Sequence, residues 1–407
     1  MLRLAAVLLV AVPIALTAQG GGSRVFTGAT LIDGTDRAPI PNATIVVQDG
    51  RIVGAGIMDP RSLPGIPRVD LGGKFVIPGL INAHGHVNGP ADLNTYAAYG
   101  VTTVYSLGGE PQSVFAARAA QNTPTLNRAR VFVAGPVIGP DTPEEARTQV
   151  AGAVAQNVDI IKIRVDDNLG TTKKMAPELY RAVIDEAHKR GKRVASHLFY
   201  LADAKSLLDA GTDFVAHSVR DVDVDADFIA KLKARNICYS PTLMREVSTF
   251  VYESTPDFFS DPLFLSHANK EWMATAKDPA RQQAMRTSAS AQRYKVALEM
   301  AKKNLKKLSD AGIPIAMGTD TGPNQRFQGY FELMELELMV KAGLTPRQAL
   351  TAATSAAARC GRIDQDLGAL QANKAADFVV LDGDPLADIS NVRRISDVYV
   401  AGNRIAR

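Results

Sequence analysis

Short apolar segments alternate with helical stretches through the middle of the chain, and this alternation constrains the fold more than any other feature. Helical stretches such as Pro177 to Arg190 and Arg293 to Ala311 separate most of the apolar segments. Strands that alternate with helices predict parallel βα units, and eight such units within roughly 280 residues predict a (β/α)8 barrel. The predicted strands are Phe75 to Ala83, Val101 to Leu107, Arg130 to Ala134, Ile160 to Val165, Arg193 to Ser196, Phe214 to Ala216, Ile237 to Thr242 and Pro314 to Gly318.

Both ends of the chain have a different texture, with short apolar runs between turn residues. Val25 to Gly28, Ala43 to Val47 and Arg51 to Ala55 lie near the N-terminus, and Ala376 to Leu381 and Val398 to Val400 lie near the C-terminus. Neither end has enough strands to be stable alone. We therefore predict one small β-sandwich domain, residues 19–78 and 362–407, into which the barrel domain, residues 79–361, is inserted.

The first residues are typical of a signal peptide. Arg3 precedes the apolar stretch Leu4 to Ala18, which is too short to span a bilayer comfortably. Residues 1–18 as a cleaved signal peptide predict a periplasmic or secreted protein that has no membrane segment after cleavage. A short membrane anchor is the alternative interpretation.

Charge and cysteine content exclude some classes of function. The formal net charge is +4, and no run of Lys and Arg has interleaved aromatic residues, so we expect no nucleic-acid partner. Cys238 and Cys360 lie far apart in the sequence, and one disulfide or two free buried thiols fit equally well. Neither is part of a CxxC pair, which argues against a thiolate metal site.

Residue types that bind metals fall at the ends of the predicted strands, where barrels of this kind carry their active sites. The candidates are His84, His86, Lys162, His197, His217 and Asp320. Alternate residues of a strand face the same side, so both imidazoles of His84-Gly85-His86 can point inward. Four of the six histidines lie at strand ends, a distribution that packing does not explain.

Each candidate alone has an ordinary structural alternative. His197 and His217 fit satisfied core histidines, and Asp320 fits a loop cap. Lys162 is the most informative, because Ile160, Ile161 and Ile163 surround it and a buried lysine must be neutral or paired. It is either a snorkelling or ion-paired lysine, or a neutral amine that has taken up CO2 to become a metal-bridging carbamate.

With these motifs the sequence resembles the amidohydrolase superfamily, in its imidazolonepropionase-like and Xaa-Pro-dipeptidase-like branch. The resemblance covers nearly the whole mature chain. It rests on Val76 to His86, Ile160 to Ile163, Ser196-His197, Ala216 to Ser218, Met317 to Asp320, Leu344 to Thr354, and Leu367 to Leu370 with Ala375 to Asp377. Asn82 and Ala216 depart from it, where related sequences often have Asp and Glu, but neither change removes a ligand.

The resemblance implies two divalent metal ions, most simply zinc. His84, His86 and Asp320 would hold the more buried ion. His197 and His217 would hold the more exposed one. Carboxylated Lys162 and a hydroxide would bridge the two ions, with Asp320 as general base and later as proton donor to the leaving amine.

The resemblance also favours hydrolysis over deamination, since no glutamate lies between His197 and Asp203, where deaminases of the superfamily carry one. We expect an enzyme that cleaves an amide bond of dipeptides, N-acyl amino acids or related aromatic amides. The alternative is a hydrolase of lactones, cyclic imides or phosphotriesters at the same site. A non-catalytic scaffold would have lost ligands, and all six candidates are present.

Several further residues are candidates for substrate contacts. The cations Arg164, Arg220 and Arg326 lie near predicted ligands and suit a substrate carboxylate, although each also fits an ion pair with a nearby acid. Tyr239 is a candidate to polarise the scissile carbonyl, and Tyr200 is a weaker candidate for substrate binding. The long segment Arg245 to Gln292 has weak periodicity and predicts a lid or pocket wall. The apolar helix Tyr330 to Ala342 fits either the core or the interface of a homo-oligomer.

Overall fold

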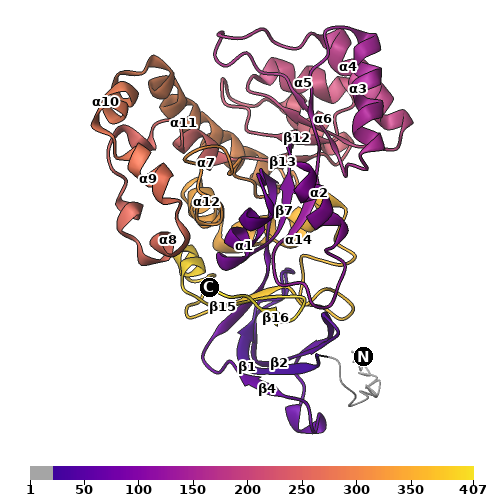
Figure 1. The fold of residues 1–407 in the computed structure, drawn as a ribbon, viewed down its shortest axis with the longest axis vertical. Coiled ribbons are helices and arrows are strands. Elements are labelled where there is room, and N and C mark those ends of the chain that lie inside the picture. The colour runs from indigo at the N-terminus through magenta and orange to yellow at the C-terminus, as the bar shows by residue number, and fades with distance from the viewer. Residues whose placement is uncertain (1–21) are drawn as a thin grey trace, which may run out of the picture.

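The computed structural model describes residues 22–407 (Figure 1). The predicted signal peptide, residues 1–18, lies outside the described residues. Between residues 22 and 407, none of the helices combines the length and the apolar character needed to cross a membrane. Figure 1 shows strands from both chain ends gathered at one end of the molecule, with most of the helices stacked above them.

Both ends of the chain contribute to one sheet. Its strands are β1 (Arg24–Leu31), β2 (Ile40–Gln48), β3 (Arg51–Gly56), β4 (Arg68–Asp70), β5 (Phe75–Pro78), β14 (Phe378–Leu381), β15 (Ile395–Val400) and β16 (Asn403–Arg404). They run in the order β16-β15-β14-β5-β1-β2-β3, with β4 paired to β1. β5 joins the two ends, because it pairs with β1 on one side and with β14 on the other. A second, stacked layer and the exact domain boundaries stay predictions.

Local sequence explains how this sheet forms. β2 and β3 meet at Asp49 and Gly50, which take positive φ values of 48° and 79°. Such values suit a tight hairpin turn, and a glycine adopts them without strain. Phe26, Phe378 and Tyr399 then pack their rings together with centroids 4.6 to 5.0 Å apart, so apolar residues from both chain ends share one core.

The middle of the chain forms two parallel sheets. β6 (Leu80–Gly85), β7 (Val101–Ser106) and β8 (Arg130–Val133) make the first. The second has the order β13-β12-β11-β10-β9, from β9 (Val137–Ile138), β10 (Ile161–Arg164), β11 (Val194–His197), β12 (Phe214–Ala216) and β13 (Cys238–Ser240). The predicted α/β class with parallel strands is confirmed. The structure adds β9, which was too short to be recognised in the sequence.

The predicted eighth strand, Pro314 to Gly318, is irregular. It makes a parallel bridge from Ile315 to Tyr239 in β13. On its other side, the carbonyl of Met317 accepts a hydrogen bond of 2.8 Å from the backbone N–H of Ala83 in β6. This segment therefore lies between the two parallel sheets, and complete closure of a barrel stays a prediction.

The predicted first strand is two strands. Gly79 separates β5, in the terminal sheet, from β6, in the parallel sheet. A Cβ at this position would lie 2.8 Å from the Cβ of Thr102, so only glycine fits. The strand that carries His84 is therefore directly continuous with the sheet built from the chain ends.

Helices follow most of the parallel strands. They are α1 (Pro90–Ala98), α2 (Gln112–Ala119), α3 (Pro143–Ala155), α4 (Pro177–Lys189), α5 (Leu201–Ala210), α6 (Ala226–Ala234), α11 (Ala289–Asp310), α12 (Tyr330–Lys341), α13 (Pro346–Ala352) and α14 (Ser355–Gly361). Proline opens α1, α3, α4 and α13, where its missing N–H leaves no helical bond unmade. In α12, Phe331, Leu333 and Leu336 are buried, so its apolar residues belong to the core of the chain.

The segment from Arg245 to Gln292 is mostly helical. It contains the end of α7 (Leu243–Val247), the turns η2 (Val251–Glu253) and η3 (Asp257–Ser260), then α8 (Pro262–His267), α9 (Lys270–Ala276) and α10 (Pro279–Thr287). Its helices are too short for a clear periodicity, but Asp261, Asn269 and Asp278 cap α8, α9 and α10 through their side chains. Figure 1 shows α8, α9 and α10 in a column along one side. Their role as a lid stays a prediction.

Cys238 and Cys360 form a disulfide, which decides between the two alternatives for these residues. Cys238 begins β13 and Cys360 lies in α14, and their Cα atoms are 5.8 Å apart. The bond links two segments that are 122 positions apart in the chain.

Candidate metal centre

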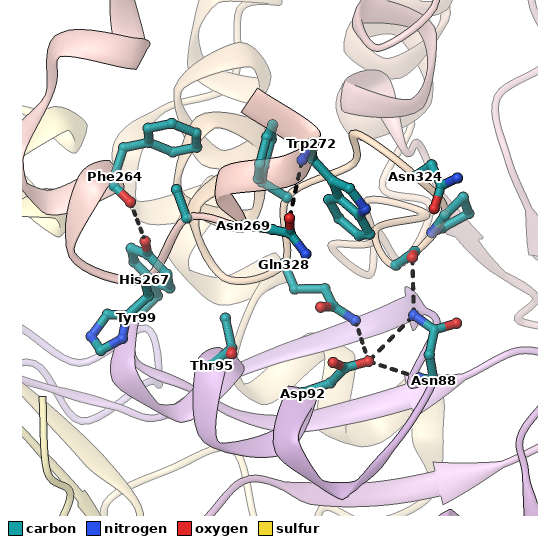
Figure 2. Close-up of a pocket in the computed structure, with 14 residues that line it drawn as sticks. Asn88, Asp92, Thr95, Tyr99, Phe264, His267, Asn269, Trp272, Asn324 and Gln328 are labelled. Carbon is teal, nitrogen blue, oxygen red and sulfur yellow. Dashed lines mark hydrogen bonds between the residues drawn. The ribbon is translucent and has the colours of Figure 1, made fainter. Parts of the chain in front are cut away.

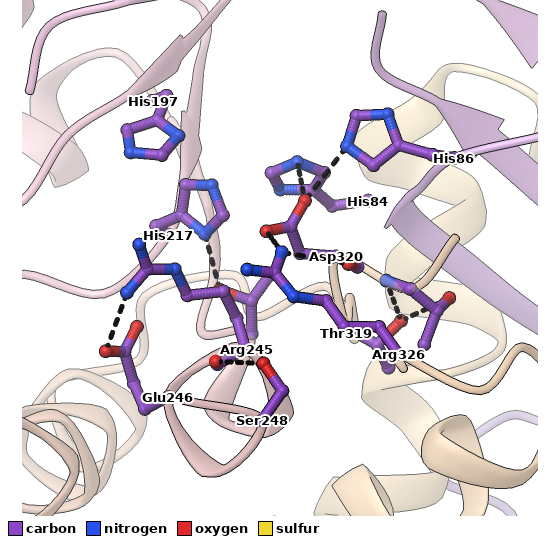
Figure 3. Close-up of polar contacts among 12 residues, drawn as sticks. His84, His86, His197, His217, Arg245, Glu246, Ser248, Thr319, Asp320 and Arg326 are labelled. Atoms are coloured by element: carbon purple, nitrogen blue, oxygen red, sulfur yellow. Dashed lines mark hydrogen bonds and ion pairs between the residues drawn. The ribbon is translucent and has the colours of Figure 1, made fainter. Parts of the chain in front are cut away.

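The six predicted metal ligands lie at the ends of parallel strands. His84 and His86 are at the end of β6, Lys162 is in β10, His197 ends β11, His217 follows β12 and Asp320 follows the irregular segment. Figure 3 shows the four imidazoles around one centre, with Asp320 beside His84 and His86. Neighbouring ring centroids are 5.8 Å apart for His84 and His86, 4.4 Å for His84 and His217, and 4.1 Å for His197 and His217.

One group of three ligands has the spacing of a metal site. The ligand atoms of His84, His86 and Asp320 all lie within 4.8 Å of one another. Oδ1 of Asp320 is 2.9 Å from Nε2 of His86 and 3.5 Å from Nε2 of His84. Two imidazole nitrogens and a carboxylate oxygen are a ligand set that divalent zinc commonly takes.

Three of the four histidines use one ring nitrogen to hold the ring in place. Nδ1 of His86 lies 3.1 Å from the carbonyl of Gly108, and Nδ1 of His217 lies 2.7 Å from the hydroxyl of Thr242. Nε2 of His197 lies 2.8 Å from Asp166. Metal-binding histidines show this arrangement, in which one N–H donates outward and the other nitrogen keeps its lone pair for the ion. The buried Nε2 of His217 has no partner in the described residues, as such a role requires.

Lys162 lies next to His84 in this group. Its Nζ is 3.1 Å from Nε2 of His84, and the residue is 3% exposed. Burial lowers the pKa of Lys162 to about 7, because a charged ammonium loses its hydration there. A large part of the population is therefore a neutral amine near pH 7, the form that can react with CO2.

Burial also lowers the pKa of His197 to about 3 and the pKa values of His84 and His217 well below their usual value, so these three imidazoles are neutral. Burial alone would raise the pKa of Asp320. The nearby Arg326 guanidinium, with His86 and His84, instead holds that pKa well below its usual range. Neutral imidazoles and an ionised carboxylate are the protonation states that metal binding needs.

A buried polar network contacts the backbone of His84, the first of the predicted ligands. Asn82 donates to Glu332 at 2.6 Å and to Thr319 at 2.9 Å, and its carbonyl oxygen accepts the backbone N–H of His84 at 2.9 Å. Thr321 also donates to Glu332, at 2.6 Å. Glu332 is fully buried, and burial raises its pKa. Asn82 therefore acts as a donor to Glu332 and sets the backbone position of the first ligand.

The structure separates the predicted substrate contacts by their accessibility. Arg326 pairs with Asp320 at the edge of the centre. The Arg164 side chain is 42% exposed and lies by Asn168, and the hydroxyl of Tyr200 donates to Asp167 at 2.9 Å. Two others are sealed inside. Arg220 is 1% exposed, and the hydroxyl of Tyr239 accepts the backbone N–H of Val219 at 2.8 Å. Substrate contacts of these residues stay predictions.

Sequence reasoning did not identify four residues of this site as functional. Asp166 and Thr242 orient His197 and His217, and Arg245 and Glu246 lie on α7 near the same histidines (Figure 3). In the sequence, Asp166 is recognisable only as an acid close to Lys162 and Arg164 that could pair with either. For Thr242 and Glu246 there was no signal beyond their place after the seventh predicted strand.

A hollow of about 510 Å3 lies near the backbone of His86, and none of the six predicted ligands lines it (Figure 2). Trp272, Phe264 and Phe327 line it together with amide side chains, among them Asn88 and Gln328. Gln328 donates to the backbone carbonyl of His86 at 2.9 Å and to Asp92 at 2.8 Å. The hollow has the size of a small-molecule pocket, and it contains no Lys or Arg.

Comparisons with known proteins agree with this geometry. The sequence profile of the amidohydrolase family matches residues 75–405. An imidazolonepropionase of Streptomyces avermitilis is 24% identical over 390 residues, which are 90% of this chain and 87% of that protein. A solved Bifidobacterium longum structure, assigned as a prolidase, is 27% identical with a TM-score of 0.76 and 95% coverage of both chains. A Xaa-Pro dipeptidase with methionine in its active site is 20% identical with a TM-score of 0.76, covering 95% of this chain and all of that one.

Proposed function

Since the chain belongs to the amidohydrolase family and is a hydrolytic enzyme acting on C–N bonds, we propose that it cleaves the amide bond of dipeptides, N-acyl amino acids or related aromatic amides with two divalent metal ions. One observation carries the proposal. Four imidazoles, a buried lysine and a carboxylate meet at the ends of parallel strands, and the outer nitrogens of three imidazoles are held by hydrogen bonds.

The residues fit a pair of metal ions. His84, His86 and Asp320 would hold one ion, and His197 and His217 would hold the other. Lys162 lies within hydrogen-bonding distance of His84, so its carbamate would be placed to bridge both sites. Zinc suits these ligands, and the two ions, when bound, lower the pKa of water and polarise a carbonyl oxygen.

The chain's own side chains supply the proton transfers and the orientation. Asp320 takes the proton from the attacking water and passes it to the leaving amine nitrogen, so that the C–N bond breaks without expelling an amide anion. Arg326 positions the second oxygen of this carboxylate. Asp166 and Thr242 keep the rings of His197 and His217 from rotating.

Two further proposals concern the barrel architecture and the location of the protein. We propose that the two parallel sheets and residues 314–319 together form the (β/α)8 barrel. A structural disulfide is typical of an oxidising compartment, which supports a periplasmic or secreted protein. A homo-oligomer stays a prediction.

Metal analysis combined with amide hydrolysis tests the proposed function. The mature protein should contain two equivalents of divalent metal and should hydrolyse members of a panel of dipeptides and N-acyl amino acids. Lys162→Ala and Asp320→Asn should each lose turnover, and Lys162→Ala should also lose metal. His188→Asn is the matched control, because His188 pairs with Asp213 on the outside of α4.

Two results would count against it. A metal content of one ion or none per chain would contradict a carbamate that bridges two ions. Turnover of lactones, cyclic imides or phosphotriesters without turnover of any amide would assign the centre to a different bond.

A further inference from the structure

We propose that Arg245 binds a free carboxylate of the substrate next to the metal centre, so that the enzyme selects amides of carboxylate-bearing amines such as amino acids. The inference rests on the proposed amide hydrolysis and names its substrate class. Arg245 was not among the arginines selected from the sequence, and its position on α7 became clear only in the structure.

Arg245 belongs to a buried group of two arginines and one glutamate. Nη1 of Arg245 is 3.1 Å from one oxygen of Glu246, and Nε of Arg220 is 2.9 Å from the other. The side chains of Arg245, Glu246 and Arg220 are 8%, 1% and 0% exposed, respectively. One carboxylate thus faces two guanidinium groups in a place that water hardly reaches.

Two nitrogens of this group are buried donors without an acceptor among the described residues. Nε of Arg245 and Nη2 of Arg220 are buried and have no hydrogen-bond partner in residues 22–407. A buried guanidinium N–H without an acceptor is unfavourable, and a carboxylate satisfies it with strong, charge-assisted bonds. Arg220 is sealed, because its Nη1 donates to the backbone carbonyls of Leu198 and Ser218. The Arg245 side chain is 8% exposed against 0% for Arg220, so Arg245 is the more accessible member of the group.

Arg245 is held rigidly for this task. Its guanidinium lies 4.5 Å from the ring centroid of Tyr294, and Nη2 donates to the Tyr294 hydroxyl at 3.2 Å. Glu335 accepts the backbone N–H groups of Leu243 and Met244 at 2.8 and 2.7 Å and so fixes the start of α7. A guanidinium that is already oriented loses little entropy when it binds a planar carboxylate.

The position also fits the reaction. Arg245 lies three residues after Thr242, whose hydroxyl contacts His217, so α7 begins next to that histidine. A molecule of amino-acid size can therefore place its carboxylate at Arg245 while its amide lies over the metal centre.

Matched pairs of substrates test this directly. We would compare N-acetyl-L-methionine, N-acetyl-L-leucine and N-acetyl-L-phenylalanine with their C-terminal carboxamides. The metal-loaded enzyme should favour each hydrolysed free acid over its carboxamide by about 30-fold or more in kcat/KM, since loss of a buried charged partner has effects of this size. Arg245→Gln should abolish this preference, mainly through KM. Arg147→Gln, on the exposed face of α3, is the control and should keep the preference.

A second variant and a binding measurement guard against a folding defect. Arg245→Lys keeps the charge beside Glu246 but loses the planar fork, so it should fold, retain metal and still lose most of the preference. Calorimetry with metal-loaded Asp320→Asn should show that each free acid binds about 30-fold or more tightly than its carboxamide, and that Arg245→Lys in this background weakens only the acid.

The outcomes separate the two proposals. Equal hydrolysis of acids and carboxamides by the wild type, or an unchanged preference in Arg245→Lys, would overturn the carboxylate role and leave amide hydrolysis intact. Absence of all amide turnover would overturn the proposed function, and calorimetry would then decide the carboxylate role alone. Equal affinity for acid and carboxamide in the calorimetry would rule out the carboxylate-binding role of Arg245.

Discussion

Removing the disulfide between Cys238 and Cys360 should reduce stability by an amount that follows from chain length. The bond closes a loop across 122 positions of sequence, from β13 to α14. In the chain-entropy description, a cross-link restricts the unfolded ensemble more strongly as the loop grows. For a loop of this length the entropy removed corresponds to about 5 kcal/mol at 25 °C.

The same loss can be expressed as a temperature. The unfolding entropy of a chain of this size is about 0.8 kcal/mol/K, taken from the average for globular proteins per residue. A loss of about 5 kcal/mol in the free energy of unfolding then lowers Tm by about 6 °C. Cys360 is 5% exposed, so replacing its sulfur adds a small packing defect to this value.

Urea unfolding and calorimetry measure the effect under oxidising and reducing conditions. Reduction of the wild-type protein isolates the bond from side-chain changes. Cys238→Ala and Cys360→Ala should each show nearly the full loss, and the double variant should show little more, because the bond is already absent in either single variant. None of the three should respond to reductant.

Two results would refute this reasoning. Additive losses in the single and double variants would mean that the two sulfurs contribute separately through packing. An unchanged Tm on complete reduction of the wild type would mean that the unfolded chain is not restricted by the cross-link.

Three further predictions concern the metal centre. Asn82→Asp should lower the free energy of unfolding by about 1–3 kcal/mol, because it places a carboxylate against buried Glu332, and adding Glu332→Gln should recover stability in a urea double-mutant cycle. Thr242→Val should weaken metal binding about 10- to 100-fold in a chelator competition, since the outward partner of His217 is lost, and an unaltered affinity would contradict that role. Gly318→Ala should lower Tm and metal content together, because the added methyl group overlaps neighbouring side chains, and a protein with normal Tm would show that the site can widen.

The ligand types were predictable from sequence because they depend on local pattern. His84 and His86 are alternate residues at the end of an apolar strand. Lys162 is a charged residue type within a run of isoleucines, which marks it as buried. Strand ends in a parallel α/β chain meet at one edge, so residues distant in sequence could be assigned to one centre. The hydrogen-bonding partners were not predictable in this way, since Asp166 and Thr242 have the same appearance as any loop Asp or Thr.

Packing features were harder to foresee for a different reason. The helices between Arg245 and Gln292 are too short to show a period, and their capping residues also occur in plain loops. Whether Cys238 and Cys360 were joined depended on their separation in space, which the sequence does not contain. The single terminal sheet depends on β5 pairing with strands from both ends, a contact that the spacing of residues along the chain does not reveal.

The position of β5 has a consequence for the order in which the chain folds. Its residue Pro78 pairs with Phe378, which leaves the ribosome 300 positions later. β5 continues through Gly79 into β6, the strand that carries His84, so His84 and His86 depend on a strand whose neighbour is synthesised almost last. Contacts between such distant segments form slowly. We therefore expect the complete centre to fold only after translation ends. A chain truncated before β14 would carry all six ligands but would lack the strand that pairs with β5.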